Sequence, residues 1–154
     1  MDQLKIIKPD VLDVKYMQEL VYEDVENGNI LDRNSNEMAT TIRSYSAVKL
    51  ENQFIGFVAV HIHTTELAEV RSLVVKKEFR GKNIAKFLIE KAILEAKSLN
   101  LKKLLVLTYK KELFEHFGFV VIEKASLPDT KIWADCIKCK HFPICDEIAL
   151  TLDI

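Results

Sequence analysis

The chain has 154 residues, of which 49% are hydrophobic, and its 22 basic and 23 acidic side chains leave a formal net charge of −1. That length suits one domain with a real core. The near-neutral charge argues against nucleic-acid binding, which usually goes with a strongly basic domain. The apolar stretches are shorter than the roughly 20 residues of a membrane span, and the first residues lack the apolar region of a signal peptide. We therefore expect one cytoplasmic domain over residues 1–154, with no membrane or nucleic-acid partner.

The first third of the chain is predicted to alternate strands and helices. Asp10 suits the N-cap of a helix, because apolar residues follow it at helical spacing and Asn27-Gly28 ends the pattern. The polar turn 51–53 separates two strand-like runs and indicates a hairpin. The elements expected here are strands at 4–8, 45–50 and 54–63, and helices at 11–25 and 36–44.

The remainder of the chain continues the mixed pattern, with a strand at 66–75 followed by the clearest helix, at 84–99. Its predicted buried stripe comprises Ala85, Leu88, Ile89, Ala92, Ile93, Ala96 and Leu99. Further elements are expected as strands at 104–108, 119–122 and 147–152 and a short helix at 113–117. The irregular segment 127–146 holds all three cysteines. This order predicts a mixed α/β domain.

The most informative segment runs from Glu69 to Lys86, where a strand leads through a basic turn into the long helix. The N-terminus of a helix carries unpaired N–H groups and a partial positive charge, which suit a phosphate. Gly81 and Asn83 tolerate the left-handed backbone that such a turn needs. The basic residues around it are Lys76, Lys77, Arg80, Lys82 and Lys86. These features predict a phosphate site, although the charges alone are equally compatible with a solvated loop.

The turn, residues 80–85, reads Arg-Gly-Lys-Asn-Ile-Ala and resembles the acetyl-CoA signature of the GNAT superfamily of N-acetyltransferases, Gln/Arg-x-x-Gly-x-Gly/Ala, with Asn83 in place of a glycine. The order of elements and the later Phe-Gly-Phe at 117–119 agree with that family. The resemblance implies the GNAT fold, a mixed and mostly antiparallel sheet flanked by helices, with acetyl-CoA as cosubstrate. Turn amides would bind the pyrophosphate, and the preceding strand the pantetheine arm. The implied cofactor-binding residues are Leu73, Val74, Val75, Arg80, Gly81, Lys82, Asn83, Ile84, Ala85 and Lys86.

The resemblance also implies direct transfer of the acetyl group to an amine, which requires a base and an oxyanion donor. Glu69 is the predicted base, acting through water, and a cross-strand salt bridge to a lysine is the alternative. A backbone N–H near Leu73 or Val74 would stabilise the oxyanion. His61 and His63 share a strand face, and we expect a packed or exposed pair rather than a metal site.

The departing CoA thiolate can be protonated by an acid, and many relatives use a tyrosine four residues before the glycine of the Gly-Phe pair. That position is Phe114 here, which has no proton to donate. Water, Tyr109 or His116 would then serve, and Tyr109 alternatively contacts CoA. A non-catalytic acetyl-CoA-binding module therefore stays open as an alternative to an enzyme.

The segment after residue 127 resembles the tail of short bacterial N-acetylglutamate synthases. The residues that carry this likeness are Lys131-Ile132-Trp133, Asp135-Cys136, Cys139 and Cys145-Asp146-Glu147, together with 69–73. The implied reaction acetylates the α-amine of L-glutamate, the first step of arginine biosynthesis. Arg71 and Lys131 would bind the carboxylates, although Arg71 could instead pair with Glu69. Another amino acid, a polyamine or a protein N-terminus are the alternative acceptors, and a homodimer is a further expectation.

Four residues of the same tail could supply soft ligands to zinc, namely Cys136, Cys139, His141 and Cys145. Their spacing differs from common zinc ribbons, so a loop packed by small thiols is favoured and no metal is predicted. An odd number of cysteines also fits a reducing compartment better than a disulfide framework.

Overall fold

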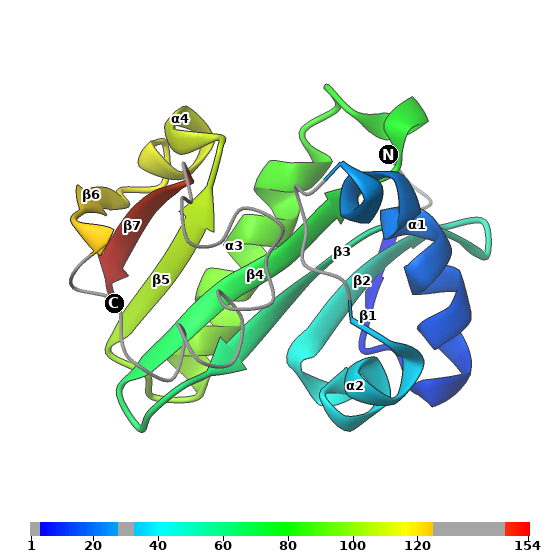
Figure 1. The fold of residues 1–154 in the computed structure, drawn as a ribbon, viewed down its shortest axis with the longest axis horizontal. Coiled ribbons are helices and arrows are strands. Elements are labelled where there is room, and N and C mark those ends of the chain that lie inside the picture. The colour runs from blue at the N-terminus through cyan, green and yellow to red at the C-terminus, as the bar shows by residue number, and fades with distance from the viewer. Residues whose placement is uncertain (1–3, 28–32, 125–146) are drawn as a thin grey trace.

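The computed structural model describes residues 4–27, 33–124 and 147–154, which form a seven-stranded sheet with helices on both faces (Figure 1). The strand order is β1-β2-β3-β4-β5-β7-β6. Every neighbouring pair is antiparallel except β4 and β5, which run parallel. The predicted mixed, mostly antiparallel sheet is therefore confirmed.

The strands begin and end within one residue of the predicted bounds. They are β1 (Leu4–Ile7), β2 (Tyr45–Leu50), β3 (Gln53–Ile62), β4 (Leu67–Val75), β5 (Lys103–Thr108), β6 (Val120–Ile122) and β7 (Ile148–Asp153). The last strand inserts between β5 and β6, an order that the sequence pattern did not predict.

The described residues form four α-helices: α1 (Val14–Glu26), α2 (Ser35–Thr40), α3 (Ile84–Ser98) and α4 (Lys111–Glu115). Short 3₁₀ turns at Val11–Asp13, Ile42–Ser44 and Lys77–Phe79 precede α1, β2 and α3. Asp10 caps the first turn as expected: its carboxylate accepts from the Leu12 N–H at 2.9 Å, and the Asp13 carboxylate accepts from the Asp10 N–H at 2.9 Å. Within the described ranges, no helix has the length and apolar character that a membrane crossing demands.

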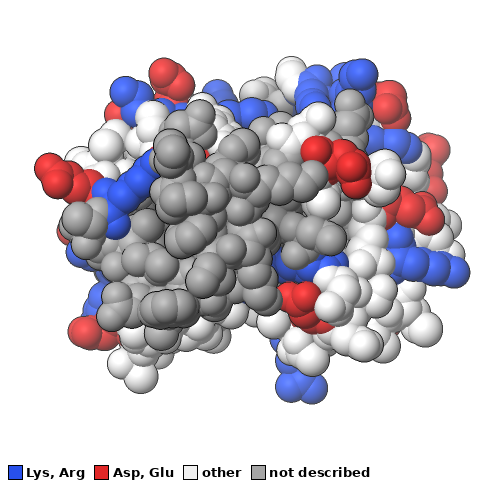
Figure 2. Space-filling model, in the orientation of Figure 1, with Lys and Arg blue, Asp and Glu red and all other residues white. Residues whose placement is uncertain are grey.

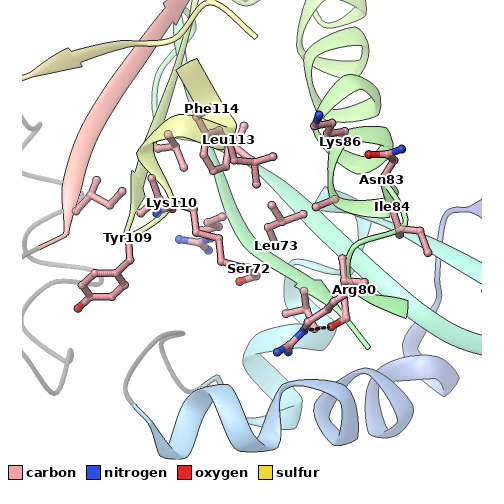
Figure 3. A pocket seen from close by; sticks show the side chains of 18 of the residues that line it. Ser72, Leu73, Arg80, Asn83, Ile84, Lys86, Tyr109, Lys110, Leu113 and Phe114 are labelled. Atoms are coloured by element: carbon pink, nitrogen blue, oxygen red, sulfur yellow. Dashed lines mark hydrogen bonds between the residues drawn. The ribbon is translucent and has the colours of Figure 1, made fainter. Parts of the chain in front are cut away.

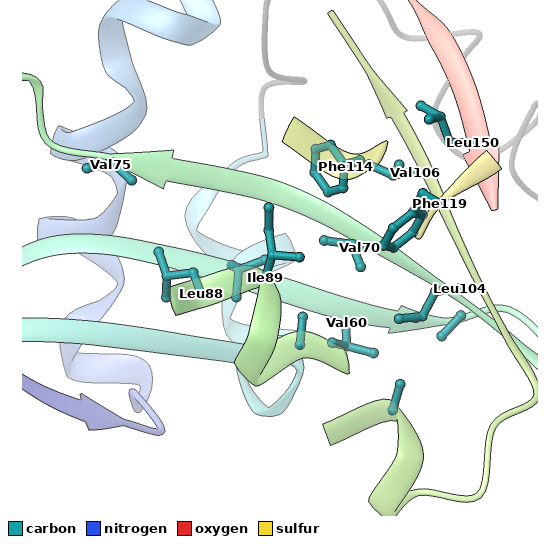
Figure 4. Close-up of a cluster of buried hydrophobic side chains, with 14 of the residues drawn as sticks. Val60, Val70, Val75, Leu88, Ile89, Leu104, Val106, Phe114, Phe119 and Leu150 are labelled. Carbon is teal, nitrogen blue, oxygen red and sulfur yellow. The ribbon is translucent and has the colours of Figure 1, made fainter. Parts of the chain in front are cut away.

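Each face of the sheet has its own core. On the α3 face, helix α3 packs against strand residues that include Val60, Val70, Leu104 and Leu150 (Figure 4). On the opposite face, which we call the α1 face, residues of α1 and α2 pack against β2, β3 and the end of β4. The buried residues of this second core are Val14, Met17, Met38, Tyr45, Ala47, Phe54, Phe57, Ala59 and Val74. The surface is mixed in charge, and Figure 2 shows basic and acidic side chains interspersed over its visible described part.

The predicted stripe of α3 is wrong at its last position, because Leu99 is 50% exposed. The helix ends in a Schellman motif, in which the Leu101 N–H donates to the Ala96 carbonyl at 3.1 Å and the Asn100 N–H to the Lys97 carbonyl at 3.0 Å. Asn100 takes the left-handed conformation, with φ of 63°. That reversal turns Leu99 outward and buries Leu101 instead.

Gly56 in β3 allows an unusually close approach between three elements. A Cβ atom there would lie 2.7 Å from the Val74 carbonyl oxygen of β4 and 3.2 Å from the Leu88 Cδ1 of α3. A carbonyl held in a sheet cannot yield as a flexible side chain can, so only glycine fits without moving β4.

Candidate active site

Strands β4 and β5 pair only at their beginnings and then diverge (Figure 1). Their register is Leu67 with Lys103, Ala68 with Leu104 and Glu69 with Leu105. Beyond Glu69, a cavity of about 560 Å³ opens between the end of β4, the start of α3 and the residues that follow β5. We call this space the wedge cavity.

A β-bulge shapes the β4 wall of the wedge cavity. Phe57 pairs with Val74 and Ala59 with Arg71, so Ser72 and Leu73 together lie opposite Val58. Ser72 takes a left-handed conformation, with φ of 57°. The bulge reverses the alternation of side chains: Val70 packs on the α3 face, whereas Val74 packs on the α1 face.

The bulged residues lie between the two sides of the cavity, where Figure 3 shows Ser72 and Leu73. A bulge takes its extra residue out of the regular hydrogen-bond ladder. A main-chain group that the bulge leaves out of the ladder would be available to a ligand in a way that those of a paired strand are not. This fits the expected oxyanion donor near Leu73 but does not test it.

The turn from β4 into α3 has the backbone that its sequence predicts. Gly81 has φ of 81° and Asn83, the N-cap of α3, has φ of 65°. The Arg80 Nε donates to the Val75 carbonyl at 3.0 Å and ties the turn to the end of β4 (Figure 3). Among the described residues, the Asn83 side chain caps no N–H of the first turn of α3. The start of α3 thus retains the donors and the positive dipole end that suit an anion.

Nine of the ten residues predicted to bind the cofactor line this one cavity: Leu73, Val74, Val75, Arg80, Gly81, Asn83, Ile84, Ala85 and Lys86. Lys82 is the exception, because it is exposed and its Nζ lies 5.6 Å from the centroid of the Phe79 ring. The structure thus brings these nine residues, all from 73–86, to one cavity, and their binding role remains a prediction.

The opposite side of the wedge cavity is formed by residues that follow β5 (Figure 3). Tyr109 and Lys110 line it, and Tyr109 is 41% exposed. Phe114 lines the cavity from α4 but is only 2% exposed. Its ring packs edge-on against that of Phe119, with 5.4 Å between the ring centroids. Phe114 is therefore a core residue, and His116 is exposed at the end of α4.

Glu69 lies on the α1 face at the last position where β4 pairs with β5, which is where the wedge cavity begins. Its side chain is 2% exposed, and its Oε1 lies 2.9 Å from the Nε2 of His63, which is 3% exposed. The cross-strand partner is thus a histidine rather than the lysine considered from the sequence. Arg71, two residues further on the same face, lines the cavity.

The bond between His63 and Glu69 was not predicted from the sequence. The alternation of a strand puts His61 and His63 on one face, but only the hairpin register, which pairs His61 with Glu69, puts that face beside the carboxylate. The His61 and His63 rings pack edge to face, with 4.9 Å between their centroids. Lys110 and Glu147, which also line the cavity, were likewise not singled out as site residues.

Two expectations fall outside the described residues. Lys131, predicted to bind substrate, and the cluster Cys136, Cys139, His141 and Cys145 lie within 125–146. In the part of the chain that the structure describes, no group of three or more His, Cys, Asp or Glu is arranged to hold a metal ion.

Comparison with known proteins identifies the family to which this chain belongs. A family model described as "Acetyltransferase (GNAT) domain" matches residues 43–121. An uncharacterized N-acetyltransferase of Chlorobaculum tepidum is 37% identical over 123 residues, which cover 80% of this chain and 79% of that protein. An amino-acid acetyltransferase of Pasteurella multocida is 28% identical over 79% of this chain, but the match spans only 28% of that longer protein.

Among solved structures, N-acetylglutamate synthase from Neisseria gonorrhoeae, complexed with coenzyme A and N-acetyl-glutamate, has a similar fold. The TM-score is 0.87 at 18% identity, over 97% of this chain and 35% of that one. At this identity the likeness concerns the fold alone. The family match over half of the sequence and the similarity to the Chlorobaculum protein are stronger evidence, and from them the chain belongs to the GNAT family of N-acetyltransferases.

Proposed function

We propose that this protein transfers the acetyl group of acetyl-CoA to the α-amine of L-glutamate, the first step of arginine biosynthesis in the cytoplasm. The observation that carries the proposal is the wedge cavity, which unites the bulged end of β4 with the N-terminus of α3. The amino-acid acetyltransferases among its relatives support an amino acid as acceptor.

The chemistry of the α3 side of the cavity fits the pyrophosphate of CoA. Gly81 and Asn83 hold the turn in left-handed conformations, so the main chain can approach an anion closely. Arg80 and Lys86 add positive charge at the same wall. The pantetheine arm would lie along Leu73 to Val75, at the end of β4.

The chemical step needs few side chains. The amine nitrogen attacks the thioester carbonyl, the C–S bond breaks, and CoA leaves as a thiolate that takes a proton from water or Tyr109. Glu69 accepts the amine proton through water, because its buried carboxylate lies at the vertex of the wedge and not on the cavity wall. A main-chain N–H near Leu73 donates to the oxyanion.

Arg71 supports an anionic acceptor. It lines the wedge cavity on the face that carries Glu69, so a carboxylate bound to its guanidinium would place the attached amine near the proposed base. Lys131 is proposed as the second cationic partner, on the likeness of its segment to short N-acetylglutamate synthases.

A second function, acetyl-CoA binding without turnover, is favoured by one observation. Phe114 is a buried core residue at the position where many relatives place an acid. Such a module would bind CoA and release none from acetyl-CoA, whichever amine is supplied.

An amine panel tests the proposal directly. CoA release from acetyl-CoA is measured with L-glutamate, L-glutamine, L-aspartate, spermidine and a peptide with a free N-terminus. We expect the highest kcat/KM for glutamate, about tenfold or more above glutamine, since a charge-assisted hydrogen bond contributes about 1.5–3 kcal/mol. Activity confined to spermidine or the peptide would contradict the glutamate assignment, and CoA binding with no turnover would favour the module.

A further inference from the structure

His63 and Glu69 form a deeply buried polar contact at the vertex of the wedge cavity. The hairpin between β3 and β4 holds it in place, because the His63 N–H donates to the Leu67 carbonyl at 2.9 Å. The side chains meet across the strands, 2.9 Å from Nε2 to Oε1, and are 3% and 2% exposed. The ring of His61 packs edge-on against His63, with 4.9 Å between centroids, which restricts the rotation of the His63 imidazole.

Burial of this pair carries a desolvation penalty, so filling space in the core is not a sufficient reason for it. A buried carboxylate is unfavourable unless hydrogen bonds replace its water, and a hydrocarbon pair would fill the same space without that penalty. With its ring proton on Nε2, His63 donates to Oε1, and this bond restrains the rotation of the Glu69 carboxylate and stabilises its ionised form. Glu69 also pairs with the last β5 residue before the strands part, directly before the first cavity residue, Val70.

The geometry points to His63 as the positioning residue of the reaction: it holds the Glu69 carboxylate ionised and oriented toward the vertex of the wedge cavity. The inference rests on the proposed function, in which Glu69 is the base. His63 acts through Glu69 and touches neither acetyl-CoA nor the acceptor amine. General-base catalysis depends on the geometry of the base, so a small displacement of the carboxylate is sufficient to slow the reaction.

Kinetics of four variants test the inference: Glu69→Gln, His63→Leu, His63→Gln and the double variant His63→Leu/Glu69→Gln. We expect His63→Leu to lower kcat by about 10- to 100-fold, the range that misplacement of a reacting group produces, with the KM for acetyl-CoA unchanged within about twofold. His63→Gln should recover most of the activity, because its side-chain amide can donate to Glu69 in place of Nε2. The double variant should match Glu69→Gln, since two residues that act as one unit are not additive.

Several results would overturn the inference while leaving the proposed function in place. One is a normal kcat in His63→Leu when the kcat of Glu69→Gln is reduced. Another is a loss of kcat in the double variant equal to the product of the two single losses. His61→Gln is the matched control: it removes the ring that packs on His63 but keeps the bond to Glu69, and its kcat should stay within about threefold of the unaltered protein. An equal loss in His61→Gln would assign the effect to ring packing. A normal kcat for Glu69→Gln would instead reject Glu69 as the base, and the inference with it.

Histidine NMR of the substrate-free protein gives an answer that needs no activity and no leucine variant. The side-chain nitrogen shifts of His63 should show a proton on Nε2, and that signal should move in Glu69→Gln. A neutral His63 protonated only on Nδ1 would mean that a protonated Glu69 donates to Nε2, and this would overturn the inference even if glutamate proves to be the substrate.

Discussion

On the α3 side of the wedge cavity, the proposed ligand contacts are mainly with the main chain, whereas the proposed base and the acceptor site on the sheet side are side chains. At the α3 side, the features that matter are the left-handed residues Gly81 and Asn83 and the N–H groups of the first helical turn. At the sheet side they are a buried carboxylate, its histidine partner and the guanidinium of Arg71. One side presents a shape that many sequences can make, and the other presents specific functional groups.

This difference indicates how the two sides should respond to mutation. Conservative changes of side-chain chemistry should impair the sheet side while the fold stays intact. Changes of backbone freedom should impair the α3 side and stability together. The following predictions test whether the two sides really separate in this way.

The largest effect is expected from Glu69→Gln, which keeps the shape of the side chain and removes its basicity. General acid–base catalysis contributes about 10²- to 10⁴-fold to rate, so kcat should fall within that range. The KM for acetyl-CoA should stay within about twofold, since the cofactor is proposed to contact 73–75 and the α3 side but not Glu69. Steady-state kinetics measure both, and a rise in the KM for acetyl-CoA equal to the loss of kcat would show that the two sides are not separate.

Arg71→Ala should act mainly on the acceptor. Loss of a guanidinium–carboxylate contact costs about 1.5–3 kcal/mol, which corresponds to a KM for glutamate raised by about 10- to 100-fold. Arg71→Lys is the matched variant, because it keeps the charge but loses the planar, bidentate geometry. Its KM for glutamate should lie between those of the unaltered protein and Arg71→Ala. An unchanged KM in Arg71→Ala would assign Arg71 a structural role.

Gly56→Ala tests the backbone that supports the cavity from the far side of β4. The new Cβ would lie 2.7 Å from the Val74 carbonyl oxygen, so β4 must shift or the sheet must loosen. Overpacking of this kind costs about 1–3 kcal/mol, which a denaturant titration would measure as a lower free energy of unfolding. We also expect a raised KM for acetyl-CoA, because the displaced residues line the cavity. Unaltered stability would mean that the approach of β3 to β4 can relax freely.

The smallest effect is predicted at Asn83, where two substitutions should act in opposite directions. Asn83 has φ of 65°, a conformation that costs a β-branched residue about 1–2 kcal/mol and glycine almost nothing. Asn83→Val should therefore lower the free energy of unfolding by about that amount and weaken acetyl-CoA binding, whereas Asn83→Gly should do neither. Equal effects of the two variants would show that the Asn83 side chain, and not its backbone, is what the site requires.

The sequence predicted local structure better than it predicted long-range structure. Periodicity located each strand of the described residues within one residue, and Gly81 and Asn83 indicated the left-handed turn because few other residues adopt it without strain. The same logic failed at Leu99, where the apolar spacing continued past the residue at which Asn100 reverses the chain. Asn can end a helix much as Gly does, but it is also common elsewhere, so the signal was weak.

The features that make the site specific depend on pairing between distant strands. Ser72 has none of the glycine or proline signals that usually mark a bulge, and its left-handed conformation follows from its mismatch with β3. The partner of Glu69 depended on the register of the β3–β4 hairpin, and the position of β7 between β5 and β6 depended on the whole sheet. Such facts require the tertiary structure.

The extra residue at Ser72 fixes the number of residues that β4 must contain. Deleting one residue from 71–73 would restore simple alternation, so a side chain that now faces α1 would turn toward α3, and every later residue of the strand would exchange faces. The turn into α3 would then start one step too early relative to the sheet. An inserted or deleted residue should therefore be tolerated in the exposed 64–66 turn, because it would not change which face of the sheet any core side chain occupies. The same change within β4 should not be tolerated.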